Sequence, residues 1–121
     1  MEKKICIVDD DPTVITLVEA ILKKQGFAVS SASDGLDALV KIKKERPDLV
    51  ILDIMMPEIN GYDVCYQLRF NKEFDKIPII LLTSREQELD GELGKRSGIE
   101  YLRKPVNSQL LLETIAGLLA A

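Results

Sequence analysis

Three short segments of this chain are apolar at every position: Ile5–Val8, Leu49–Leu52 and Ile79–Leu82. A strand buried on both faces gives such a run, because its successive side chains point to opposite sides of the sheet. Helix-length stretches separate the runs, and weaker runs at Ala28–Ser31 and Tyr101–Leu102 continue the alternation. The pattern predicts an α/β fold with a five-stranded parallel sheet covered by helices on both faces.

The expected arrangement of these elements is a flavodoxin-like doubly wound sheet with strand order 2-1-3-4-5 and five flanking helices. A chain of 121 residues fits one domain of ordinary size, and neither a linker nor a repeat divides it. We therefore expect a single domain over residues 1–121. The sequence leaves open whether this chain is a whole protein or a piece of a longer one.

The first helix has clear start and stop signals. Asp11 is suited to cap it, Pro12 suits its first position, and Gly26 is expected to end it. Its inward face is predicted to carry Val14, Leu17, Val18 and Ile21.

The next helices are predicted from turn residues and apolar spacing. The second starts after Ser33–Gly35, ends before Pro47, and is expected to bury Leu36, Leu39 and Val40. The third starts near Gly61, with apolar residues at helical spacing at Val64, Cys65 and Leu68.

The last two helices differ in strength. The fourth, from Glu86 to Ser97, is expected to be the weakest element, since Gly91 and Gly94 each cost about 1 kcal/mol relative to alanine. The fifth, Ser108–Ala121, has more apolar residues than one inward face needs. We expect Leu110, Leu111, Ile115 and Leu118 to face inward, and Leu112, Ala116 and Leu119 to stay outside.

Composition excludes several classes of function. The net charge is −4 and no basic patch is evident, so a nucleic-acid contact by this domain is not expected. No apolar run is long enough to span a membrane and no signal peptide precedes the first strand, so we expect a cytoplasmic location. Cys6 and Cys65 are far apart in sequence and are interpreted as reduced core residues.

Polar side chains follow four of the five predicted strands. Asp9 and Asp10 follow the first, Asp53 the third, Thr83 ends the fourth, and Lys104 follows the fifth. The carboxyl ends of parallel strands lie at one edge of the sheet, and in strand order 2-1-3-4-5 the first and third strands flank the switch point where ligands bind. These side chains are therefore expected to converge.

The chemistry of this set favours a divalent cation and a phosphoryl group. Crowded carboxylates repel one another, and a bound Mg²⁺ would relieve that repulsion through hard oxygen ligands. Because the chain contains no histidine, carboxylates, hydroxyls and lysines must do any chemistry. Asp53 is both a candidate metal ligand and a candidate nucleophile, which by attacking phosphorus would form an acyl phosphate. Thr83 and Lys104 could then stabilise the charge on the phosphoryl oxygens.

Over nearly its whole length the chain resembles the response-regulator receiver family of two-component signalling. The resemblance rests on four motifs in the right order: Val8–Asp11, Leu52–Pro57 followed by Gly61, Thr83–Ser84, and Tyr101–Pro105. It implies that Asp53 is the phosphoacceptor and that Lys104 pairs with the phosphate. It further implies a switch pair, Thr83 and Tyr101, and a cis peptide bond between Lys104 and Pro105.

The resemblance also implies a metal site and partners. Asp10 and Asp53 would bind Mg²⁺ directly, Asp9 would act through water, and Met55 would contribute its backbone carbonyl. The phosphoryl donor would be a sensor histidine kinase or a histidine phosphotransfer protein, and the domain would catalyse only its own phosphorylation and slow autodephosphorylation. The output surface would consist of the fourth helix, fifth strand and fifth helix, which could also form a homodimer.

Other interpretations of the sequence remain. A flavodoxin-type carrier of FMN needs a phosphate-binding loop after the first strand, whereas Asp9–Pro12 would repel phosphate. An aspartyl-phosphate phosphatase places a second acid two residues after its nucleophile, where this chain has Met55. A degenerate receiver that only binds proteins would not need the complete polar set. Asp9 and Asp10 could merely help to cap the first helix, and the loop before Tyr101 is one residue shorter than the family's, which leaves the register of the fifth strand open.

Overall fold

The computed structural model describes residues 2–84, 96 and 98–120 and places nine regular elements in them. The strands are β1 (Lys4–Val8), β2 (Ala28–Ala32), β3 (Leu49–Asp53), β4 (Ile79–Thr83) and β5 (Ile99–Arg103). The helices are α1 (Pro12–Lys24), α2 (Gly35–Glu45), α3 (Gly61–Arg69) and α4 (Ser108–Ala120). The predicted helix from Glu86 to Ser97 falls almost wholly outside the described residues, so four of the five expected helices are described.

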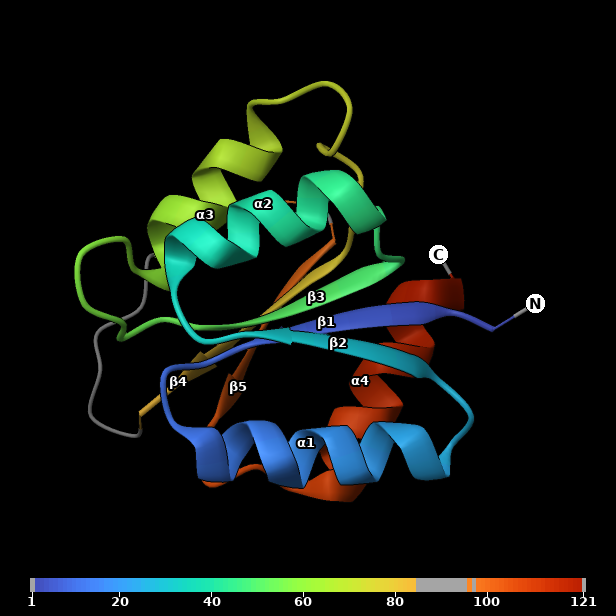
Figure 1. Cartoon of the computed structure of the whole chain (residues 1–121). Helices are drawn as coiled ribbons and strands as arrows, with labels where there is room; N and C mark the ends of the chain where they lie inside the picture. Colours follow the sequence, from blue (N-terminus) through green and yellow to red (C-terminus); the bar gives the residue numbers. More distant parts are fainter. Residues whose placement is uncertain (1, 85–95, 97, 121) are drawn as a thin grey trace.

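The five strands form one parallel sheet in the order β2-β1-β3-β4-β5, as predicted. Helices α2 and α3 cover one face, and α1 and α4 cover the other (Figure 1). The register of β5, which the sequence left open, pairs Tyr101 with Leu81 and Arg103 with Thr83. Lys104 therefore follows directly after the last paired residue of β5. No helix in the described part of the chain has the length and apolar character needed to cross a bilayer.

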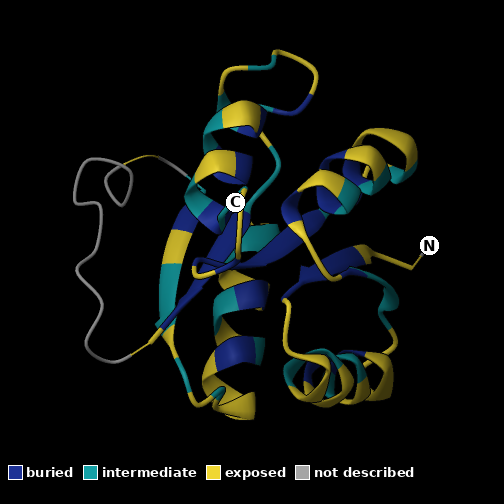
Figure 2. Ribbon diagram, turned by 60° about the vertical axis from the view of Figure 1, so that its left-hand side comes forward, coloured by how far each residue is buried: buried dark blue, intermediate teal, exposed yellow. Residues whose placement is uncertain are grey.

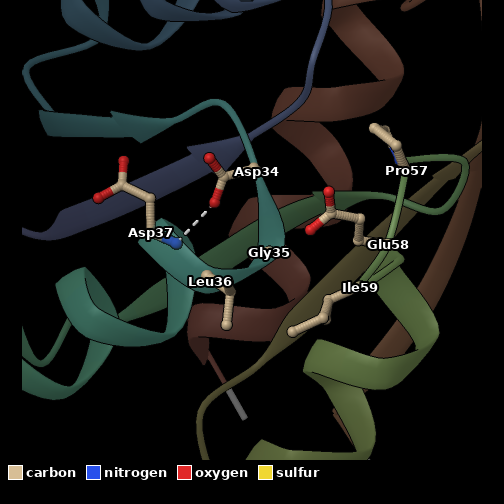
Figure 3. Close-up of a pocket in the computed structure, with 7 residues that line it drawn as sticks. All are labelled: Asp34, Gly35, Leu36, Asp37, Pro57, Glu58 and Ile59. Atoms are coloured by element: carbon tan, nitrogen blue, oxygen red, sulfur yellow. Dashed lines mark hydrogen bonds between the residues drawn. The ribbon is translucent and has the colours of Figure 1, made fainter.

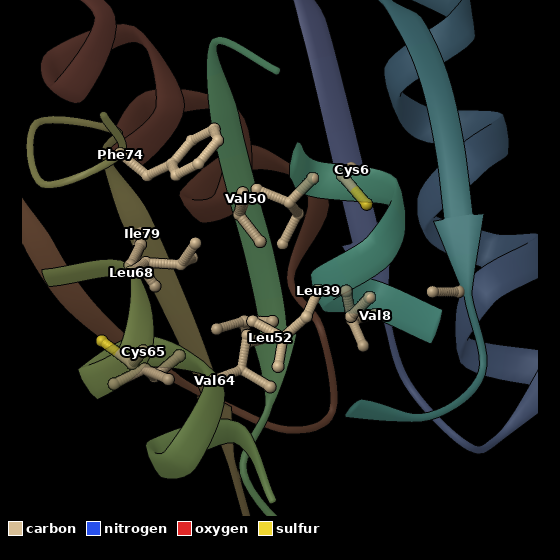
Figure 4. Packing of buried hydrophobic residues seen from close by; sticks show 14 of the residues in the cluster. Cys6, Val8, Leu39, Val50, Leu52, Val64, Cys65, Leu68, Phe74 and Ile79 are labelled. Carbon is tan, nitrogen blue, oxygen red and sulfur yellow. The ribbon is translucent and has the colours of Figure 1, made fainter. Parts of the chain in front are cut away.

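Two hydrophobic clusters hold the three layers together. One lies between the sheet and α2 and α3 and contains Val50, Leu52 and Leu68 (Figure 4). The other lies between the sheet and α1 and α4 and contains Ile51, Leu22 and Ile115. Adjacent residues of β3 thus enter opposite clusters, which explains why the central strands are apolar at every position.

The inward face of α2 differs from the prediction. Leu39 is buried as expected, but Leu36 is 58% exposed and Val40 is 65% exposed. The buried positions, Gly35, Ala38, Leu39 and Ile42, have the i, i+3, i+4, i+7 spacing of one helical face. The prediction was wrong because this face begins at Gly35, a residue without a side chain to signal its burial.

The apolar residues of α1 and α4 were also partly misassigned. Leu17 of α1 is 47% exposed, whereas Val18 and Leu22 are the buried residues of that helix. In α4, Leu111 and Ile115 are buried as predicted, but Leu110 is 50% exposed. Leu112 and Leu119, expected outside, pack partly buried against the α1/α4 cluster. Figure 2 shows how exposed and buried residues alternate along the helices.

Candidate functional site

The three acidic residues predicted to converge do so at the carboxyl edge of the sheet. Asp9 and Asp10 follow β1, Asp53 ends β3, and one carboxylate oxygen from each lies within 4.8 Å of the others. Asp10 is exposed, whereas Asp9 is fully buried and Asp53 is 4% exposed. The site is thus a carboxylate cluster with one open side.

The backbone around Asp9 fixes its orientation. Its N–H donates to the carbonyl of Ala32 at 3.2 Å, and its Oδ1 accepts from the Asp11 N–H at 2.9 Å. Asp11 itself caps α1, accepting from the Thr13 N–H at 2.9 Å. The cap of α1 is therefore Asp11, as predicted, and the carboxylates of Asp9 and Asp10 are left for the cluster.

Lys104 reaches into the cluster from the end of β5. Its Nζ lies 2.9 Å from Oδ2 of Asp9 and 3.1 Å from Oδ1 of Asp53. The Lys104–Pro105 peptide bond is cis, as predicted. The Lys104 N–H donates to the carbonyl of Thr83 at 2.7 Å, which joins the ends of β4 and β5.

The electrostatics of the cluster reflect crowding and burial. Burial and then the charge of Asp9 raise the pKa of Asp53 to about 6, although Lys104 opposes the shift. Burial alone would lower the pKa of Lys104, but the carboxylates of Asp9 and Asp53 outweigh it and raise that pKa above its ordinary value. The lysine therefore stays charged at neutral pH, while Asp53 ionises at a cost.

Thr83 and Tyr101 occupy neighbouring strands near this edge. Thr83 is fully buried at the end of β4, and its Oγ1 donates to the carbonyl of Ser84 at 3.0 Å. Tyr101 is half-buried in β5 and packs against the α2/α3 cluster. Thr83 is one residue beyond the β4 partner of Asp53, whereas Tyr101 lies two residues before the end of its strand.

Gly61 packs against the backbone of Asp53, a role that the sequence did not reveal. A Cβ at this position would lie 2.3 Å from the carbonyl oxygen of Asp53, so only glycine fits. Its N–H donates to the carbonyl of Ile54 at 3.0 Å, which folds the loop carrying Met55 back onto the end of β3. The position of Gly61 after the Leu52–Pro57 motif was the only sequence signal for this role. On its own, that glycine could equally be interpreted as a turn or a helix start.

The donor set fits a magnesium ion. All the candidate side-chain ligands are carboxylate oxygens, which a hard cation prefers. The buried Oδ2 of Asp9 contacts Lys104 as an ion pair, yet no hydrogen bond of ordinary geometry reaches it from the described residues. Such an oxygen is under-satisfied, and a cation or a cation-bound water would complete its environment.

Comparison with known proteins agrees with this architecture. The family model for the response regulator receiver domain matches residues 5–116. Protein PilH of Pseudomonas aeruginosa is 42% identical over 118 residues, covering 97% of this chain and 98% of PilH. Three longer bacterial regulators are 37–43% identical, and the chain spans 43–50% of their length.

Solved structures are similar as well. A response regulator from Chloroflexus aurantiacus J-10-fl is 34% identical, with a TM-score of 0.91 and full coverage of both chains. The receiver domain of the sensor histidine kinase PA1611 from Pseudomonas aeruginosa PAO1, which holds a magnesium ion in its active-site cleft, is 27% identical with a TM-score of 0.87 and full coverage of both chains. With the family model matching most of its length, the chain belongs to the response regulator receiver domain family, the phosphoacceptor signalling domains of two-component systems.

Proposed function

We propose that Asp53 is the residue of this domain that accepts the phosphoryl group. The observation that carries the proposal is the position of its carboxylate, which ends a central strand among two other acids and lies 3.1 Å from the ammonium group of Lys104. Within the described residues, two aspartates are buried in the three-acid cluster and contact a lysine: Asp53 and Asp9. Asp9 is less suited, because its Oδ1 already accepts a hydrogen bond from the backbone.

The reaction transfers one phosphoryl group between two nucleophiles. An oxygen of Asp53 attacks phosphorus as the P–N bond of a phosphohistidine breaks, so an acyl phosphate forms and the histidine nitrogen keeps the bonding electron pair. Lys104, charged throughout, donates to a phosphoryl oxygen in place of its present contact with Asp53. The Thr83 hydroxyl, one residue beyond the β4 partner of Asp53, can donate to another. Attack by water on the same phosphorus would reverse the modification slowly.

The chemistry implies a metal held by the acidic cluster. We assign Asp10, Asp53 and the backbone carbonyl of Met55 as direct ligands of Mg²⁺, and Asp9 as a ligand through water. When bound, the ion would neutralise the crowded carboxylates and the phosphoryl oxygens. The open side of the cluster at exposed Asp10 gives the cation and the donor a common entrance.

Signalling requires that the phosphoryl group change a distant surface. A phosphoryl group can shift a two-state domain only through contacts that are stronger in one state, and Thr83 and Lys104 are the side chains able to make them. We assign Thr83 and Tyr101 as the switch pair, since they lie on adjacent strands and Tyr101 reaches the surface.

The partners follow from this chemistry. The donor is a sensor histidine kinase or a histidine phosphotransfer protein, and we place the encounter in the cytoplasm.

We propose that the output surface lies on β5, α4 and the segment between β4 and β5, where it also permits a homodimer. Leu110, 50% exposed on α4, is the exposed large hydrophobic residue of this surface in the described part of the chain. Leu110→Glu should weaken association in sedimentation, whereas an unchanged oligomeric state would contradict this surface.

The phosphoacceptor is tested by intact-mass spectrometry after incubation with acetyl phosphate and Mg²⁺. The wild type should gain one phosphoryl group, Asp53→Asn should gain none, and the matched control Asp75→Asn, in the loop before β4, should behave like the wild type. Chelation of Mg²⁺ should suppress labelling. A Mg²⁺-dependent adduct on the Asp53→Asn variant would show that the acceptor is another residue.

A further inference from the structure

A second concave site lies outside the carboxylate cluster, between the start of α2 and the loop after β3. It has a volume of about 370 Å³ and is lined by residues 34–37 of one segment and 57–59 of the other. Figure 3 shows Ile59 extending from the loop wall toward Leu36 on the helix wall. We call this site the α2 pocket.

The helix wall of the α2 pocket presents apolar surface to solvent. Leu36 is 58% exposed at the pocket and Val40, one turn further along α2, is 65% exposed. They are two of the six large exposed hydrophobic side chains in the described residues, and no other two of these lie one turn apart on a helix. Neighbouring exposed apolar residues beside a concavity are characteristic of an interaction surface.

The rim of the α2 pocket is acidic. Asp34 accepts from the Asp37 N–H at 2.7 Å, and Asp37 lies 3.6 Å from Lys41. Glu58 extends across the pocket toward α2 (Figure 3) and has no ion-pair partner among the described residues. Among the described residues, no lysine or arginine lines the pocket. With Asp37 already paired with Lys41, Asp34 and Glu58 leave the rim with net negative charge, which together with the apolar centre favours a cationic, apolar partner.

The loop wall is fixed to the phosphoacceptor strand. A Cβ on Gly35 would lie 2.5 Å from the carbonyl oxygen of Ile59, so α2 and the loop are in close backbone contact. At its other end the same loop packs Gly61 against the carbonyl of Asp53 and holds Met55 next to the carboxylate cluster. A change of loop position at Asp53 would therefore alter the α2 pocket.

From these contacts we propose that the α2 pocket docks a segment of a partner protein that presents a leucine-like side chain flanked by lysine or arginine. Docking is coupled through the loop 55–60 to Mg²⁺ at the carboxylate cluster, a part of the proposal that rests on the proposed function. A second copy of this chain docked pocket to pocket would oppose acidic rims, in a protein of net charge −4. The occupant is therefore a basic segment of a different chain.

The test uses two synthetic peptides, acetyl-Ala-Arg-Leu-Arg-Ala-amide and its counterpart with glutamates in place of the arginines, titrated into the full ¹⁵N-labelled domain. The basic peptide should shift the amide signals of residues 34–37 and 57–59, and the acidic peptide should not. Glu58→Lys should weaken the binding roughly fivefold, the equivalent of about 1 kcal/mol for an exposed charge contact. The matched control Glu113→Lys on α4 makes the same charge change and should bind like the wild type.

The coupling is measured by repeating the Mg²⁺ titration with the basic peptide at saturation. Linkage requires the peptide to change the Mg²⁺ affinity by the factor by which Mg²⁺ changes the peptide affinity. Signal shifts confined to other surfaces, equal binding of both peptides, or no binding would overturn the docking site. Binding at 34–37 and 57–59 with an unchanged Mg²⁺ affinity would overturn the coupling. The Asp53→Asn variant, which lacks the proposed phosphoacceptor, should still bind the basic peptide at residues 34–37 and 57–59. Docking is thereby tested separately from the proposed function.

Discussion

The α-carbon of Gly61 is in contact with the carbonyl of Asp53, so closely that an added Cβ would lie 2.3 Å from that oxygen. The first residue of α3 is therefore a support for the end of β3. This contact sets the position of the loop between Asp53 and Gly61, and with it the backbone carbonyl of Met55.

Gly61→Ala should displace this loop. We expect the free energy of unfolding to fall by about 1–3 kcal/mol, the usual cost of forcing an extra methyl group into a packed site. Mg²⁺ affinity should fall with it, because the Met55 carbonyl moves. Denaturant unfolding and Mg²⁺ titration measure both effects. Gly117→Ala is the control: a Cβ there meets nothing within 4 Å, so that variant should gain roughly 0.5–1 kcal/mol from helix propensity.

Asp53→Asn should stabilise the metal-free domain at neutral pH. The pKa of Asp53 rises from 3.8 to about 6 on folding, so the folded state binds the proton more tightly and ionisation costs stability. The cost is absent below about pH 4, grows between pH 4 and 6, and is complete above it. The variant should therefore be more stable by on the order of 1–3 kcal/mol at pH 7 and equal to the wild type near pH 3.5. Thermal unfolding at both pH values, with a chelator present, measures the difference; an equal gain at pH 3.5 would contradict it.

Lys104→Ala should make the domain depend on its metal. Without the ammonium group, Asp9 and Asp53 are left as buried charges with one cation fewer, so the metal-free form should lose roughly 1–3 kcal/mol at pH 7. Mg²⁺ should bind about 3–10-fold more tightly, since the lysine no longer competes for the carboxylates. Calorimetric titration measures this, and weaker Mg²⁺ binding would indicate that Lys104 helps to order the ligands.

Thr83→Ala should separate phosphorylation from signalling. Because Thr83 is not a metal ligand in our assignment, the variant should still bind Mg²⁺ and accept a phosphoryl group at Asp53. It should lose the shift of the Tyr101 amide signal that a phosphoryl mimic produces in the wild type. Thr83→Ser, which keeps the hydroxyl, should restore that shift. If both variants respond like the wild type, the switch does not run through this hydroxyl.

The strands and the site were predictable from sequence because their signals are local. Each central strand is an unbroken apolar run, and the three acids of the cluster lie at or just after the ends of two of them, so strand order alone brings Asp10 and Asp53 together. The outward faces of the helices were harder. Leu36 and Val40 are apolar and would be expected in the core. They are exposed because Gly35 is the residue that packs against Ile59. These two residues are 24 positions apart, so the helical spacing of apolar residues could not predict their contact.

The backbone hydrogen bond from Lys104 to Thr83 has a mechanical consequence. The side chains of Thr83 and Lys104 would both contact the phosphoryl group, and this hydrogen bond joins the backbones that carry them. A force on either side chain would therefore act on the backbone of both strands. A force on the ammonium group, just beyond the exposed carboxyl end of β5, would thus become a sliding force between β4 and β5, and β5 is an edge strand whose Glu100 and Arg103 are exposed.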